Sequence, residues 1–149
     1  PADRAYIAGV WGIDVSELPK PGLSAFEMLD RMGTPGGVRG LLVLASNIAV
    51  SAPDVNRVID RLRALDLLVV SDIFLSETAA LADIVLPTAQ WAEEDGTMTN
   101  LEGRVIRRRQ ALPPPAGVHD DLWLMKELAD RLGRGRFFSA AVCSSASAT

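Results

Sequence analysis

Apolar residues recur at helical spacing in several separate stretches of the chain. One of these stretches predicts a crossover helix with Ser51 or Asp54 as its cap. Its five apolar residues at helical spacing are Val55, Val58, Ile59, Leu62 and Leu65. A capping box at Ser24 predicts an earlier helix of about ten residues. Further helical stretches are predicted over 2–11, 76–81, 88–94 and 121–132.

Strand-like runs alternate with these helices. Three mostly apolar runs have the composition of strands buried on both faces: 38–44, 67–71 and 84–86. The alternation of strands and helices predicts a parallel sheet with right-handed connections. Turn signals at Asp95-Gly96 and Glu102-Gly103 predict a β-hairpin or an extended loop after the third strand. The expected fold is therefore α/β, a Rossmann-like three-layer αβα domain built on a parallel sheet.

Length and composition fit one domain followed by a short tail. The chain has 149 residues, of which 48% are hydrophobic and 23% charged, as is usual for a globular domain. We expect the α/β domain to occupy residues 1–138. Residues 139–149 are almost entirely small and polar, so a disordered Ser/Ala tail is predicted there.

Charge and cysteine content exclude several classes of function. A net charge of −4 argues against a nucleic-acid partner, because such proteins usually carry a basic surface. Cys143 is the one cysteine, which excludes an intrachain disulfide and a cysteine-only zinc site. The longest apolar runs fall far short of the roughly 20 residues that cross a bilayer. We therefore expect no membrane span and a cytoplasmic location.

Candidate functional residues lie in the loops after the strands, because parallel α/β sheets bind ligands at the carboxyl ends of their strands. Ser46 and Asn47 follow the first strand and could bind phosphate, although ordinary loop capping is the simpler explanation of these residues. Asp72 follows the second strand. Its carboxylate could accept paired hydrogen bonds from a ribose diol or a guanine, or it could cap the following turn.

The segment after the third strand offers further polar groups. Asp83 and the acidic run 93–95 could line a site, with a solvated acidic face as the alternative. The stretch 96–104 could hold a polar heterocycle, with Glu102 and Arg104 as a candidate buried pair, although a plain hairpin is the simpler explanation. No nucleophile–base pair, metal-ligand cluster or acid–base dyad stands out. The residues alone predict a nucleotide-binding domain without catalytic or metal-binding residues.

Three segments carry a more specific resemblance: Asp-Ile-Phe-Leu-Ser-Glu-Thr-Ala at 72–79, Ala-Asp-Ile-Val-Leu-Pro at 82–87, and Glu-Asp-Gly-Thr-Met-Thr-Asn-Leu-Glu-Gly-Arg-Val at 94–105. In order and spacing they resemble the third domain of the bis-molybdopterin guanine dinucleotide oxidoreductases, the family of nitrate reductases and formate dehydrogenases. The likeness extends through 47–54 and 121–133 and covers residues 4–138. Two departures are Ile48, where the family usually has proline, and Ser71, where glutamine is common.

The resemblance implies a set of cofactor-binding residues and a ligand, the guanosine end of a molybdopterin guanine dinucleotide in a Mo-bis-MGD centre. Ser46 and Asn47 would lie near the phosphates and Asp72 on the guanine or ribose. The remaining implied contacts are Thr78 and Asp83 in the same crevice, and Asn100, Glu102 and Arg104 from the segment after the third strand.

The stretch at 11–12 and 19–25 is most similar to assimilatory-type nitrate reductases. The resemblance therefore implies a fragment of a nitrate reductase catalytic subunit that is inactive alone. Its partners would be the remaining domains, with the 4Fe–4S cluster in their N-terminal part, and an electron-donor protein or subunit. A formate dehydrogenase alpha-subunit fragment is one alternative, and a non-catalytic nucleotide-binding module is another. The change in composition after Phe138 further suggests a truncated or frameshifted end.

Overall fold

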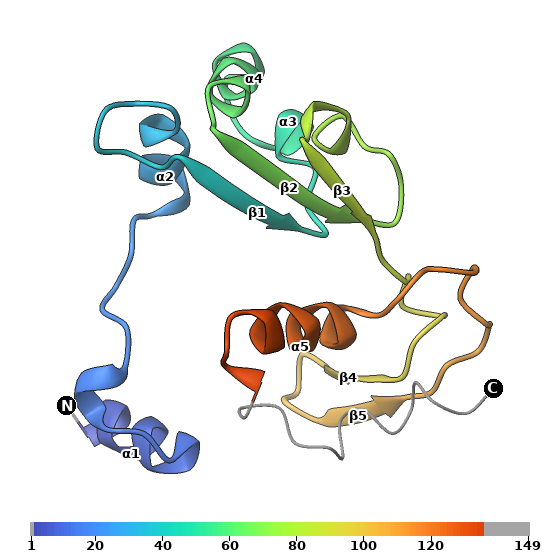
Figure 1. Ribbon diagram of the computed structural model, residues 1–149. Helices are drawn as coiled ribbons and strands as arrows, with labels where there is room; N and C mark the ends of the chain where they lie inside the picture. Colours follow the sequence, from blue (N-terminus) through green and yellow to red (C-terminus); the bar gives the residue numbers. More distant parts are fainter. Residues whose placement is uncertain (1, 136–149) are drawn as a thin grey trace.

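A three-stranded parallel sheet organises the first half of the molecule (Figure 1). The computed structural model describes residues 2–135, so the predicted tail lies outside the described residues. The strands β1 (Gly40–Leu44), β2 (Leu67–Asp72) and β3 (Ile84–Pro87) lie side by side in that order. Leu42 pairs with Val69, and Val69 pairs with Ile84. The predicted parallel α/β class is confirmed.

The connections between strands are helical. Between β1 and β2 the chain forms α3 (Ile48–Ser51) and α4 (Val55–Arg63), and between β2 and β3 it forms the 3₁₀ turn η2 (Ala79–Leu81). The predicted crossover helix is confirmed as α4. The additional turn α3 lies in a stretch that was predicted to be a loop. The sequence did not predict this turn, because four residues are too few to show a periodic pattern.

The N-terminal segment forms α1 (Ala2–Trp11), the 3₁₀ turn η1 (Val15–Glu17) and α2 (Ala25–Arg31). The predicted capping box begins α2: the Glu27 N–H donates to Ser24 Oγ at 3.3 Å, and the Ser24 N–H donates to Glu27 Oε2 at 2.9 Å. The helix is seven residues long, shorter than predicted. The hydrogen bond from the Ser24 hydroxyl holds the pKa of Glu27 below its usual range.

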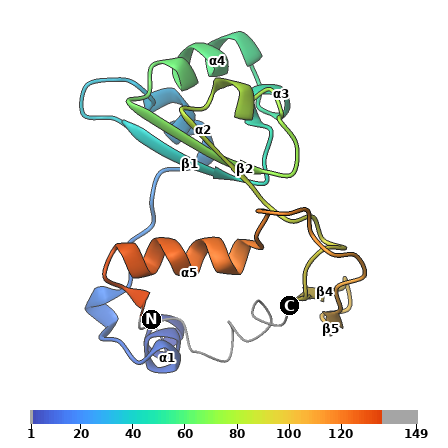
Figure 2. The ribbon, with the colours of Figure 1, turned by 45° about the vertical axis from the view of Figure 1, so that its right-hand side comes forward.

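The hydrophobic core lies between the sheet and the helices on one side of it. Figure 2 shows α2 and α4 on the same side of the sheet. Val43, Leu68 and Val70 point to this side, where they pack with five further buried residues: Met32, Ala49, Val58, Leu62 and Ala79. Right-handed crossovers in one direction along a sheet place their helices on one face, which explains the arrangement.

The other face of the sheet is only partly covered by the described residues: Ser71, which pairs with Leu44, is fully buried on it. Leu42 and Leu44 are each 40% exposed there, and Ile84 is 47% exposed. The prediction that the strands are buried on both faces is therefore right for one face only. An apolar run shows that both faces favour burial, but it does not show which segment covers each face.

Beyond β3 the chain forms a separate group of elements. β4 (Gly96–Thr99) and β5 (Val105–Arg108) form the predicted antiparallel hairpin. The helix α5 (Asp121–Arg131) is capped by Asp120, whose carboxylate accepts the Trp123 N–H at 2.7 Å. The predicted helix over 88–94 is wrong. That stretch forms turns instead, and Thr88 bridges to His119, a long-range pairing that local sequence does not reveal. Within residues 2–135, no helix has the length and composition to cross a bilayer.

Candidate functional site

The loops after β1 and β2 are tied together by Asn47 and Thr78. Thr78 is fully buried, and its hydroxyl donates to Asn47 Oδ1 and accepts the Ala49 N–H, both at 2.9 Å. Asn47 Nδ2 donates to Glu77 Oε2 at 2.7 Å, which holds the pKa of Glu77 below its usual range. The structure thus brings two of the predicted site residues together, and it gives both a role in fixing the loops at the carboxyl edge. Ser46, just before Asn47, is half-buried at the same edge.

Asp72 ends β2 at the same edge. Its Oδ1 accepts the Ile73 N–H and its Oδ2 accepts the Ser76 hydroxyl, both at 2.8 Å. The turn-capping role that the sequence left open is therefore present. These two hydrogen bonds leave acceptor sites on the Asp72 carboxylate, because its two oxygens offer about four lone-pair sites. Asp72 keeps the capacity to accept further hydrogen bonds from a ligand.

Ser71, the residue before Asp72, is a buried polar residue that the sequence did not single out. It is fully buried, and its hydroxyl has no hydrogen-bond partner in the described part of the chain. Neighbouring residues of a strand point to opposite faces of the sheet, so the Ser71 side chain shares a face with its pairing partner Leu44 and not with Asp72. The sequence showed Ser71 only as a departure from a common glutamine, which did not indicate its burial.

A cavity of about 420 Å³ opens at the carboxyl ends of β2 and β3. It begins at the residue after Asp72, and its lining includes Ile73, Phe74, Pro87 and Thr88. The Phe74 side chain is 75% exposed and so is available for contact with a ligand. The volume falls in the range of roughly 300–1,000 Å³ that is usual for small-molecule sites.

Asp83 lies at the opposite edge of the sheet. Its Oδ2 accepts the N–H of Leu68, near the start of β2, at 2.7 Å. The Asp83 N–H in turn donates to the Leu68 carbonyl oxygen at 2.9 Å. This reciprocal pair fixes the register of β2 and β3. The structure does not bring Asp83 into the crevice with Asn47 and Asp72.

The three predicted residues of the hairpin lie at its turn. Asn100 Oδ1 accepts the N–H groups of Glu102 at 3.1 Å and Arg104 at 2.9 Å, which fixes the turn. Glu102 and Arg104 are exposed and form no ion pair with each other, so the expected buried pair is wrong. The half-buried pair of this region is Arg108 with Glu94, at 2.7 Å.

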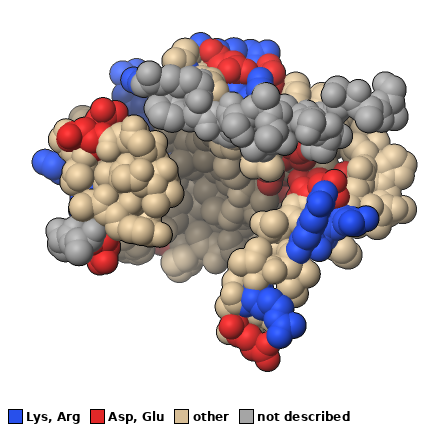
Figure 3. All heavy atoms as spheres, turned by 90° about the horizontal axis from the view of Figure 1, so that it is seen from below, with Lys and Arg blue, Asp and Glu red and all other residues tan. Residues whose placement is uncertain are grey.

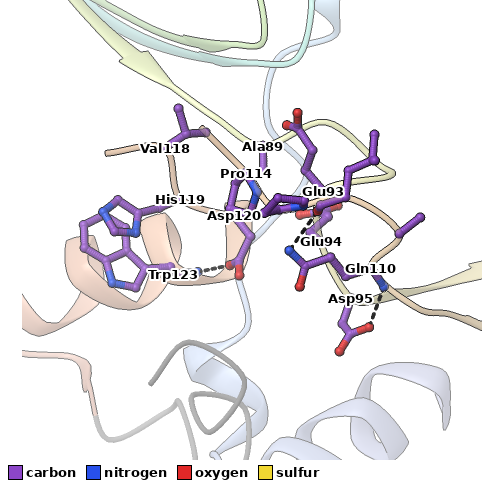
Figure 4. Close-up of a pocket in the computed structure, with 13 residues that line it drawn as sticks. Ala89, Glu93, Glu94, Asp95, Gln110, Pro114, Val118, His119, Asp120 and Trp123 are labelled. Carbon is purple, nitrogen blue, oxygen red and sulfur yellow. Dashed lines mark hydrogen bonds between the residues drawn. The ribbon is translucent and has the colours of Figure 1, made fainter. Parts of the chain in front are cut away.

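A second cavity of about 550 Å³ lies between the hairpin and α5. The His119 ring stacks on Trp123 with centroids 3.7 Å apart on one side of it, and Glu93, Glu94 and Asp95 lie on the other (Figure 4). His119 thus packs against Trp123. None of the predicted cofactor-binding residues lines this cavity or the 420 Å³ cavity, although the latter begins at the residue after Asp72.

Comparison with known proteins identifies the family. Residues 15–131 match the family model described as molybdopterin oxidoreductase. The chain is 46% identical over 136 residues to the assimilatory nitrate reductase catalytic subunit of Bacillus subtilis, covering 91% of this chain and 19% of that protein. It is also 46% identical over 129 residues to the F420-dependent formate dehydrogenase subunit alpha of Methanocaldococcus jannaschii, covering 87% of this chain and 19% of that protein.

A solved structure agrees. The fold matches acetylene hydratase from Pelobacter acetylenicus with a TM-score of 0.68 and 31% sequence identity, covering 74% of this chain and 16% of that one. The chain thus spans about one fifth of the length of the curated relatives it matches. Its sequence, its sheet topology and these likenesses lead to one conclusion: the chain belongs to the molybdopterin oxidoreductase family.

Proposed function

We propose that this chain holds the guanosine end of a molybdopterin guanine dinucleotide, as part of the catalytic subunit of a molybdenum-dependent oxidoreductase of the nitrate reductase type. The observation that carries the proposal is Asp72, a carboxylate with unused acceptor capacity that ends β2 beside the 420 Å³ cavity. Family membership supports a molybdopterin cofactor. The guanine dinucleotide form is what the family resemblance implies, and the acceptor chemistry at this edge is compatible with it.

The residues at the carboxyl edge fit a guanine base. Guanine presents an N1–H and an exocyclic amino group side by side, and an ionised carboxylate is an acceptor-only partner for such a pair. Phe74 and Ile73 offer an apolar wall for the faces of the base.

The other predicted residues have different roles in this proposal. Asn47 and Thr78 hold the loops that border the crevice, with Ser46 and the remaining Asn47 amide hydrogen toward the phosphates. The hairpin turn of Asn100, Glu102 and Arg104 approaches the cofactor from the other group of elements. Asp83 fixes strand register and takes no part in binding.

The bound cofactor supplies the redox chemistry, and this chain contributes binding and orientation. Because the chain spans about one fifth of its relatives, we propose that it has no turnover alone. The remaining domains, with a 4Fe–4S cluster, would complete the enzyme. An electron-donor protein would supply it with electrons in the cytoplasm.

Nitrate is the proposed substrate because of the likeness to the Bacillus subtilis assimilatory nitrate reductase. A formate dehydrogenase is the second candidate. One observation favours it: the identity to the Methanocaldococcus jannaschii formate dehydrogenase subunit is the same 46%. Assays of nitrate reduction and formate oxidation by the longer protein would distinguish the two.

Calorimetric titration of the chain with guanosine and adenosine diphosphates tests the proposal. We expect measurable binding of GDP and a much weaker response to ADP. The change Asp72→Asn should weaken GDP binding by about ten- to a hundredfold, since hydrogen bonds to charged groups contribute about 1.5–3 kcal/mol. Asp60→Asn, an exposed carboxylate on α4, is the matched control and should leave affinity unchanged.

Xanthosine diphosphate separates base recognition from loss of structure. Xanthine has a carbonyl where guanine has the amino group, so an asparagine side chain, with one donor and one acceptor group, matches it better than a carboxylate does. Asp72→Asn should therefore gain affinity for xanthosine diphosphate while losing it for GDP. Equal binding of GDP and ADP, or an Asp72→Asn chain that binds GDP normally, would contradict the proposed function.

A further inference from the structure

The Asp72 carboxylate is held by two hydrogen bonds, one to each of its oxygens. Oδ1 accepts the N–H of the next residue, Ile73, and Oδ2 accepts the Ser76 hydroxyl, both at 2.8 Å. Each carboxylate oxygen offers about two lone-pair sites, so about one acceptor site remains on each. Two acceptors side by side match the two neighbouring donors of a guanine base only while the carboxylate keeps one orientation.

Neither packing nor an ion pair keeps Asp72 in this orientation. The three residues between Asp72 and Ser76 are exposed, and two of them, Phe74 and Leu75, are each 75% exposed. Within residues 2–135, no lysine or arginine forms an ion pair with Asp72. Figure 3 likewise shows no lysine or arginine in the recessed region between the protruding parts of the molecule, which is seen from below. In the described part of the chain, the Ser76 hydroxyl is therefore the tie between the carboxylate and a residue beyond its own neighbour.

Ser76 is in turn held by the hydrophobic core. Its hydroxyl oxygen accepts the Ala79 N–H at 3.3 Å, and its carbonyl oxygen accepts the Ala80 N–H at 2.8 Å. Ala79 is 2% exposed and packs in the core under the sheet. A hydroxyl has one hydrogen, and because the Ala79 N–H occupies a lone pair, that hydrogen is left for Asp72. The contacts thus run from the core through Ala79 and Ser76 to the carboxylate.

We propose that Ser76 is a positioning residue for guanine recognition: its hydroxyl fixes the Asp72 carboxylate so that both oxygens meet the base together. The proposal rests on the proposed function, because it concerns the same carboxylate. It goes further by assigning to Ser76 the preference for guanine over a purine that lacks the exocyclic amino group. A carboxylate that is already ordered loses less freedom when the ligand binds, which raises affinity. Ser76 acts through Asp72 and does not touch the base.

Two nucleotides that differ by one amino group test this role. Inosine diphosphate (IDP) keeps the N1–H of guanine but lacks the amino group, so it uses one oxygen of Asp72 and depends less on the orientation of the carboxylate. In calorimetric titrations, Ser76→Ala should weaken GDP binding by about three- to tenfold and IDP binding by less than about twofold. The preference of the chain for GDP over IDP should therefore shrink. A merely structural role of Ser76 would instead weaken the binding of both nucleotides to the same extent.

Two further variants are the controls. Ser76→Thr keeps the hydroxyl, so it should retain the GDP affinity and the preference over IDP of the unmodified chain within about twofold. Ser16→Ala removes a hydroxyl of the same kind, which donates to the carboxylate of nearby Asp14 in η1. It should change neither value, because that pair is exposed and lies outside the candidate site.

Nuclear magnetic resonance measures the orientation of Asp72 without any ligand. Three-bond couplings to its Cγ report the χ1 angle, and the unmodified chain should show one rotamer that becomes averaged in Ser76→Ala. An averaged χ1 angle in the unmodified chain would overturn the inference. This measurement needs only the unmodified chain, so it decides the question even where Ser76→Ala does not fold.

The binding results separate this inference from the proposed function. Suppose that the unmodified chain binds GDP better than ADP. The inference is then overturned, and the proposed function stands, if Ser76→Ala binds GDP normally or weakens GDP and IDP equally. An unmodified chain that binds GDP and IDP equally well has the same consequence. If the unmodified chain does not prefer GDP to ADP, the proposed function fails and the inference fails with it.

Discussion

Replacing Thr78 with valine should destabilise the fold strongly, although the two side chains have nearly the same shape. The change removes the hydroxyl that accepts the Ala49 N–H and donates to Asn47 Oδ1, both at 2.9 Å. Ala49 is 2% exposed, so its N–H would be left buried without a partner. The unsatisfied group costs about 1–3 kcal/mol and the lost bond to Asn47 about 0.5–1.5 kcal/mol more. We expect a loss of about 2–4 kcal/mol in the free energy of unfolding.

Urea denaturation followed by circular dichroism measures this loss. With a slope of roughly 2 kcal/mol per M, the midpoint should fall by about 1–2 M. Thr78→Ser keeps the hydroxyl and removes one methyl group, so it should cost only about 1 kcal/mol. Thr99→Val, at an exposed position of β4, should leave the midpoint unchanged. A Thr78→Val chain no less stable than Thr78→Ser would refute the assignment of Thr78 as the tie between the two loops.

Three further predictions concern other parts of the molecule. Ser24→Ala should destabilise α2 by about 1 kcal/mol, seen as faster amide exchange in that helix, because it removes the cap of the first turn. Arg108→Met should lower the melting temperature by several degrees, since it leaves the half-buried Glu94 carboxylate unpaired. Asn47→Ala should return the lowered pKa of Glu77 toward its usual range in a carboxyl NMR titration, and an unchanged pKa would contradict the contact. Because that pKa is lowered in the folded chain, the stabilisation that it reflects is present above the unfolded-state pKa and is lost as pH falls through the folded-state pKa.

Local signals predicted much of the fold. The capping box at Ser24, the spacing of the crossover helix and the turn dipeptides of the hairpin act over a few residues, and all three appear in the structure. The segment 88–94 was predicted wrongly because its conformation depends on the bridge from Thr88 to His119, 31 positions away. The prediction that the strands are buried on both faces failed for a related reason. The apolar residues of the sheet favour burial, but they do not show which segment covers them.

The candidate site was predicted in part. Asn47, Asp72 and Thr78 follow strands, and the carboxyl ends of parallel strands share an edge, so their proximity follows from chain order. Asp83 precedes β3, so the order of the chain places it at the amino edge of the sheet, and the structure has it there. The family likeness had instead suggested that Asp83 lines the crevice at the carboxyl edge. Ser71 could not be found from the sequence, because burial of a hydroxyl without a partner depends on the folded surroundings.

The most direct test of the central claim is a map of amide chemical-shift changes when GDP is added to the chain. The largest changes should cluster at the carboxyl edge, in the loops that begin at Asn47 and Asp72 and around Thr88 at the cavity. The amides near Asp83, at the other edge, should not move. Changes centred on the cavity beside His119 and Trp123, or no changes at all, would contradict guanosine binding by Asp72.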